Sequence, residues 1–133
     1  MYRLLISLIN IPDIRIMTKS DILFPTDTTK LIKTFYDKLL ISSIKHHFIH
    51  LDLEHHLPRV EGFWNATLFP DHAYAENLMG KDAALPLQKE EFKIWLQLLW
   101  GSIDELFSGS NAEMVKNRSA SIAYIMQKKL LKE

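Results

Sequence analysis

Residues 27–40 read DTTKLIKTFYDKLL and carry the clearest helical pattern in the chain. Their apolar positions recur at the spacing that puts side chains on one face of an amphipathic helix. Those positions are Leu31, Ile32, Phe35, Tyr36, Leu39 and Leu40. The stretch opens with Asp27, Thr28 and Thr29, which are residue types that favour the beginning of a helix. It therefore predicts a helix from about residue 27 to residue 40.

Two more helices are predicted in the C-terminal third of the chain. Residues 92–107 read FKIWLQLLWGSIDELF, which has the same apolar spacing and predicts a helix of about five turns that ends at Gly109. Ser110 and Glu113 match the capping box, in which each side chain bonds the free backbone amide of the other residue. A last helix is therefore predicted from about residue 111 to residue 129.

A further helix is expected between these segments. Its apolar face consists of Val60, Phe63, Trp64, Thr67 and Leu68. Pro58 is expected near its first turn, because a deeper proline loses a backbone hydrogen bond, and His56 would then lie at the helix start. Residues 71–85 have weak periodicity, so they predict only a short helix at about 75–81.

The composition is that of one helical domain. The chain has 133 residues, of which 47% are hydrophobic and 11% aromatic, which is enough apolar surface for one core. Four glycines and five prolines argue against disorder and against turn-rich β folds. The sequence predicts an all-α fold with one domain at residues 27–133, preceded by an N-terminal extension at residues 1–26.

Charge and residue types exclude several classes of protein. Sixteen Lys and Arg residues balance sixteen Asp and Glu residues without a basic stripe, so nucleic acid is not an expected partner. No apolar run approaches the roughly 20 residues that span a bilayer, and the apolar segment 4–11 lacks a cleavage site, so we expect a cytoplasmic protein outside the membrane. The absence of cysteine excludes thiolate zinc sites and cysteine nucleophiles. No nucleophile elbow or phosphate-binding glycine loop is present, so no catalytic residue is assigned.

The histidines are concentrated in the middle of the chain. His46, His47, His50, His55 and His56 lie close together in sequence. His46 and His50 have the spacing of helical zinc sites with two histidines, yet no carboxylate or third histidine stands at a fixed helical spacing to them. The cluster is therefore interpreted as solvated histidines of a connection, one of which has a role in a pocket, and no metal ligands are assigned.

Several segments together form a longer pattern. They are Thr34-Phe35-Tyr36-Asp37-Lys38, His56-Leu57-Pro58-Arg59-Val60 with Phe63-Trp64, Phe92 with Trp95-Leu96, and residues 103–109 with Asn117-Arg118 and Ile122-Ala123. In order and spacing, from about Asp27 to Met126, these segments resemble the group III truncated haemoglobins. The resemblance implies a truncated globin-like domain, a two-over-two helical sandwich around a haem pocket.

The resemblance also implies a set of residues that bind the cofactor. Tyr36 stands at the family's distal tyrosine, His56 at its distal-side residue and Trp95 at its pocket tryptophan. A phenol O–H and an indole N–H donate hydrogen bonds to a small ligand, and an imidazole can move protons near neutral pH. Phe48, shortly before the distal segment, is placed as an aromatic haem contact.

The proximal side departs from the family pattern. Residues 74–87 read YAENLMGKDAALPL, and Asp82 occupies the position at which the family carries the histidine that binds iron. No histidine follows His72. Because an anionic oxygen ligand favours ferric iron, this substitution implies ferric or peroxide-type redox chemistry in place of reversible oxygen carriage.

Three arrangements stay open for the pocket. Haem binds with Asp82, His56 or another distal group on the iron; haem binds without a proximal bond; or the globin fold binds no haem. The leading expectation is a ligand-binding globin, rather than a dedicated enzyme, that takes haem and a small diatomic or peroxide ligand. The alternative is a haem-free globin-fold interaction or sensor module.

Overall fold

The structure, a computed structural model, describes residues 19–70 and 87–132, with side chains as far as Lys128. These residues form α3 (Pro25–Leu39), the 3-10 helix η1 (Lys45–His47), α4 (Leu53–Leu68), α5 (Glu91–Leu106) and α6 (Ser110–Lys132). The described part contains no strand, which confirms the all-α prediction. The predicted short helix at 75–81 lies outside the described residues.

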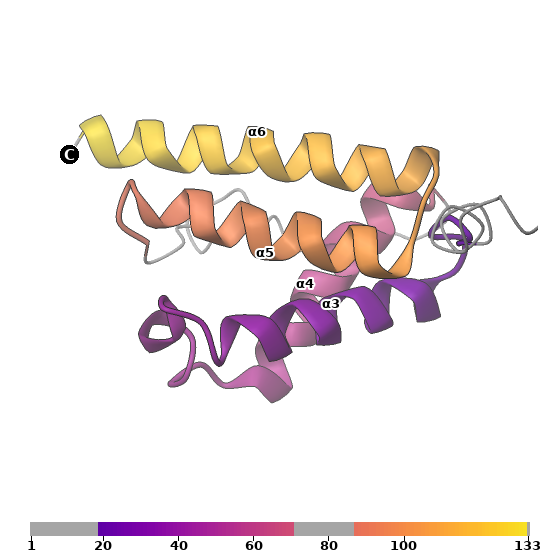
Figure 1. The fold of residues 1–133 in the computed structure, drawn as a ribbon, viewed down its shortest axis with the longest axis horizontal. Coiled ribbons are helices and arrows are strands. Elements are labelled where there is room, and N and C mark those ends of the chain that lie inside the picture. The colour runs from indigo at the N-terminus through magenta and orange to yellow at the C-terminus, as the bar shows by residue number, and fades with distance from the viewer. Residues whose placement is uncertain (1–18, 71–86, 133) are drawn as a thin grey trace, which may run out of the picture.

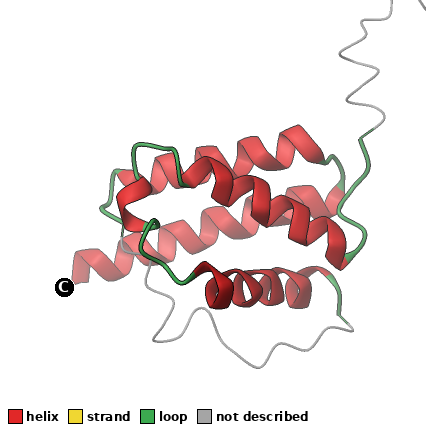
Figure 2. Ribbon diagram, turned by 90° about the horizontal axis from the view of Figure 1, so that it is seen from below, coloured by secondary structure: helices red, strands yellow, loops and turns green. Residues whose placement is uncertain are grey.

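The four α-helices pack as two pairs. Helices α5 and α6 run side by side in opposite directions, while α3 lies beneath α5 and α4 crosses α3 obliquely (Figure 1). A second view, turned by 90°, shows the loops within each pair, between α3 and α4 and between α5 and α6, at the ends of the bundle (Figure 2). Helix α3 contacts both α4 and α5, so side chains on its two inner flanks meet both neighbours.

One hydrophobic core joins the pairs. Each helix contributes apolar side chains from one face, because burial of that face drives the packing. On α4, Trp64 and Leu68 of the predicted face are buried, whereas Val60 and Phe63 are partly buried against the core. The most completely buried large side chains include Leu31, Ile32, Leu39, Phe48, Phe92, Leu99 and Ile103. None of the helices in the described part of the chain combines the length and the apolarity needed to cross a bilayer.

Helix α3 begins two residues earlier than predicted. Pro25 is its first residue, where the missing proline N–H costs no hydrogen bond. The Asp27 carboxylate accepts the backbone N–H groups of Leu23 and Phe24, at 2.9 and 3.1 Å. Asp27 therefore stabilises the start of the helix from inside its first turn, whereas the sequence pattern placed it at the beginning.

Pro58 lies deeper in α4 than predicted. The helix begins at Leu53, and the Asp52 carbonyl accepts the N–H groups of His55 and His56, at 3.1 and 2.9 Å. Pro58 therefore lies beyond the first turn, where it cannot donate to the Glu54 carbonyl. His56 lies within the first turn of α4, close to the helix start at which it was predicted.

The start of α6 also differs from the prediction. Asp21, ninety residues away in sequence, accepts the N–H groups of Asn111 and Ala112, both at 2.8 Å. This remote carboxylate caps α6 in place of the predicted Ser110–Glu113 box, and the Glu113 side chain lies beside Lys116, at 3.5 Å. The chain reverses at Gly109, whose φ of 146° favours glycine, so α5 ends at Leu106 before the turn.

Residues 19–26 belong to the packed structure. Ile22 is fully buried, and its carbonyl accepts the side-chain amide of Asn111 at 2.7 Å. The Ser20 carbonyl accepts the N–H of Ser108 at 3.0 Å. The segment before α3 thus contacts the α5–α6 turn through backbone, side-chain and apolar contacts.

Candidate functional site

A buried tyrosine and a half-buried histidine meet where α3 and α4 cross. Tyr36 comes from α3 and has an exposed fraction of 5%, and His56 comes from the first turn of α4. The Tyr36 hydroxyl and His56 Nε2 are 2.7 Å apart. Either the phenol O–H donates to Nε2 or Nε2–H donates to the phenol oxygen, according to which imidazole nitrogen carries the proton.

Burial keeps both groups uncharged. Desolvation raises the pKa of the Tyr36 phenol well above its ordinary value of 10.0, so the O–H stays protonated. Desolvation, followed by the positive charge of Arg59, lowers the pKa of His56 below 6.5. The site therefore offers a neutral hydroxyl and a neutral imidazole near pH 7, a pair that can donate, accept and exchange one proton.

Aromatic rings surround this polar pair. Phe48 lies edge-on to the Tyr36 ring, with ring centroids 6.1 Å apart. Phe35 contacts Tyr36 on one side and Trp95 on the other, with centroid separations of 5.4 and 5.9 Å. Rings that meet edge to face attract one another and exclude water, so the Tyr36–His56 bond lies in a largely apolar setting.

The structure brings together most of the residues that the sequence proposed for the pocket. Tyr36, Phe48 and His56 are direct neighbours, and Trp95 joins them through Phe35. Trp95 is 7% exposed and meets the Phe35 ring edge to face. Asp82 lies outside the described residues, so its predicted role stays a prediction.

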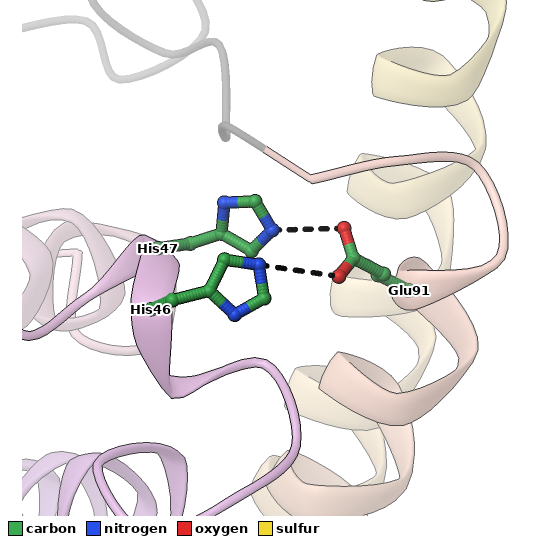
Figure 3. Close-up of side chains that lie close together, drawn as sticks. All are labelled: His46, His47 and Glu91. Carbon is green, nitrogen blue, oxygen red and sulfur yellow. Dashed lines mark hydrogen bonds and ion pairs between the residues drawn. The ribbon is translucent and has the colours of Figure 1, made fainter.

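The prediction for the central histidines needs correction. His46 and His50 do not share a helical face, because only residues 45–47 form a single 3-10 turn and residues 48–50 continue as turns. His47 is not a solvated side chain: its Nε2 lies 2.9 Å from Glu91 Oε1 at the start of α5 (Figure 3). Sequence reasoning missed this pair because 44 residues separate its members.

The lowered pKa of His56 predicts a pH-dependent stability. The folded protein binds the His56 proton less readily than the unfolded chain does, because burial and Arg59 disfavour the charged imidazole next to Tyr36. We therefore expect the free energy of unfolding to fall as the pH drops below about 6.5, toward the lower folded-state pKa. The His56→Gln variant should lose part of that slope in urea titrations from acidic to neutral pH. Parallel slopes for both proteins would refute this expectation.

Comparisons with known proteins support the fold. The structure is similar to a crystal structure of a group III truncated haemoglobin from Campylobacter jejuni, with a TM-score of 0.72 and 23% sequence identity. The similarity covers 85% of this chain and 95% of the other. Comparison with models of known protein families gives no match, and neither does comparison with curated protein sequences. The chain therefore has a truncated-haemoglobin fold, the two-over-two helical sandwich that its sequence pattern implied.

Proposed function

We propose that this chain is a haem-binding globin of the truncated type, in which Tyr36, His56 and Trp95 form the distal side of the pocket. The observation that carries the proposal is the 2.7 Å contact between the Tyr36 hydroxyl and His56 Nε2, placed among aromatic rings. In a core that only needed to pack, a polar pair of this kind offers little advantage over apolar side chains of similar volume. A pocket that binds a polar small ligand requires such donors.

The described residues fit the distal face of a haem. Phe48 and Trp95 supply apolar rings around the Tyr36–His56 pair, and a planar macrocycle would pack against these rings. When bound, haem would supply an iron centre that takes small oxygen or nitrogen ligands or peroxide. The Tyr36 phenol and the Trp95 indole would hold such a ligand by hydrogen bonds, and His56 would accept or return a proton at Nε2.

Asp82 is proposed as the group that faces the opposite side of the pocket. A carboxylate there would favour the ferric state, and with it peroxide-type redox chemistry over reversible oxygen carriage. Without the family's histidine, the cofactor would lose one bond to the protein. The burial of the apolar macrocycle would remain, and its favourable free energy scales with the area removed from water. We accordingly propose that haem binding depends mainly on apolar contacts between the macrocycle and the pocket. A cytoplasmic location fits the same proposal.

A hemin titration of the purified protein, followed by its visible spectrum, tests this function. We expect saturable binding of one hemin per chain, with a Soret band that shifts on addition of cyanide or dithionite. Tyr36→Phe should change the cyanide-induced spectrum because it removes the phenol O–H. The matched control is Tyr124→Phe, which alters an exposed tyrosine on α6 and should leave the spectrum unchanged.

The Asp82→His variant separates the two functions that the sequence left open. Saturable binding by both native protein and variant, with a stronger Soret band in the variant, supports the haem-binding globin. Binding by the variant alone would refute that proposal. It would support the alternative, a haem-free globin-fold interaction or sensor module that keeps the shape of the pocket.

A further inference from the structure

Two histidines and a glutamate converge at the edge of the bundle, outside the proposed pocket. The 3-10 turn η1 places His46 and His47 next to each other, with ring centroids 4.0 Å apart. Both imidazoles point their Nε2 atoms at the Glu91 carboxylate at the start of α5 (Figure 3). We propose that His46, His47 and Glu91 form a binding site for a divalent transition-metal ion of the zinc class.

The distances suit a single bridging ion. His47 Nε2 lies 2.9 Å from Glu91 Oε1 and His46 Nε2 lies 3.9 Å from Glu91 Oε2, and one ligand atom of each residue lies within 4.8 Å of the others. In a tetrahedral zinc site, with bonds of about 2.1 Å, neighbouring ligand atoms are about 3.4 Å apart. The observed separations fall on both sides of that value, so small side-chain rotations complete the geometry.

The Glu91 carboxylate is held in place before an ion arrives. Glu91 Oε1 accepts the backbone N–H of Gln88 at 2.7 Å, which fixes the orientation of the side chain. A second partner of this kind is the usual way in which proteins orient a metal ligand. The fixed carboxylate therefore reduces the entropy lost on binding.

Exposure leaves room for the ion and a water molecule. The side chains of His47 and Glu91 are 16% and 19% exposed, whereas that of His46 is 61% exposed. The half-closed arrangement provides three protein ligands and an open fourth position. Two imidazole nitrogens and one carboxylate oxygen select zinc, cobalt or nickel over magnesium or calcium, which prefer oxygen ligands.

An ion at this position would link η1, which lies between α3 and α4, to the start of α5. His47 immediately precedes Phe48, which packs against Tyr36. Glu91 lies one turn before Trp95 on α5. The proposed ion would thus fix two aromatic residues on the wall of the pocket relative to each other. This inference does not depend on haem binding, because its ligands lie outside the pocket.

The test uses the full chain without haem and adds zinc chloride or cobalt chloride near neutral pH. Titration calorimetry with Zn²⁺ is expected to show one saturable site per chain, and Co²⁺ should give the visible bands of a site with low coordination number. His47→Gln and Glu91→Gln should each weaken Zn²⁺ binding about tenfold or more. Zn²⁺ should also raise the melting temperature of the native protein, because binding stabilises the folded state.

The matched control is His55→Gln, an exposed histidine on α4 that bonds Asp52 and lies outside the cluster. It should bind Zn²⁺ as the native protein does. His46→Gln provides a further variant whose side chain is mostly exposed, so folding is preserved even if the other changes disturb it. Absence of saturable Zn²⁺ binding would overturn the proposal, as would equal affinities in the native protein and all three cluster variants.

Discussion

Replacing Phe48 with alanine is expected to lower the free energy of unfolding by about 3–5 kcal/mol, the usual cost of removing a buried aromatic side chain. Phe48 is 1% exposed and packs edge-on against the Tyr36 ring, so its removal leaves a cavity beside the Tyr36–His56 pair. A domain of this size is stable by only about 5–15 kcal/mol. The variant should therefore unfold at a much lower urea concentration than the native protein.

The adjacent residue supplies the control for this prediction. Ile49 is 50% exposed, and Ile49→Ala should change the free energy of unfolding by less than about 0.5 kcal/mol. Phe48→Leu retains most of the buried volume and should cost less than Phe48→Ala. Similar losses for Phe48→Ala and Ile49→Ala would show that the connection between α3 and α4 is not part of the core.

The second large effect concerns the two glycines at and near the α5–α6 turn, which should respond to alanine in opposite directions. Gly109 has a φ of 146°, and a Cβ added there would lie 2.4 Å from the Asp21 side chain. A residue forced into such a conformation costs about 1–3 kcal/mol. Displacement of Asp21 from the start of α6 adds about 1 kcal/mol for the lost cap. Gly109→Ala should therefore be strongly destabilising.

Gly101 lies within α5, and a Cβ added there meets nothing within 4 Å. Gly101→Ala should stabilise the protein by about 0.5–1 kcal/mol, because alanine loses less backbone entropy in a helix. Melting temperatures followed by circular dichroism should thus shift in opposite directions for the two variants. Melting temperatures that shift in the same direction in both variants would contradict the different roles assigned to Gly109 and Gly101.

The fold was predictable from the sequence where the information is local. The apolar spacing in residues 31–40 and 92–107 marks faces that the structure buries, because both faces obey the period of a single helix. The helix ends were less predictable. Asp21 caps α6 from a distant segment, and no local pattern reports such a contact. Pro58 was predicted near a first turn, yet α4 tolerates it deeper because tertiary packing outweighs one lost hydrogen bond.

In the candidate site, too, some residues could be proposed from the sequence and others could not. Tyr36, His56 and Trp95 could be proposed from motifs, since a family resemblance supplies contacts between distant residues that periodicity does not. The meeting of His47 with Glu91 could not be proposed, because neither residue stands in a motif and their contact depends on how η1 lies against α5. Residues that act through tertiary contact alone are visible only in three dimensions.

The contact between Asp21 and the start of α6 joins two segments that are synthesised at different times. Helix α6 begins about ninety residues after Asp21, and until those residues are synthesised the Asp21 carboxylate has no N–H groups of Asn111 and Ala112 to accept. Closing a loop of this length is slow relative to local helix formation. The Asp21 carboxylate therefore lacks this contact until the start of α6 has been synthesised, so the start of α6 gains its cap later than α3 gains its own contacts with Asp27.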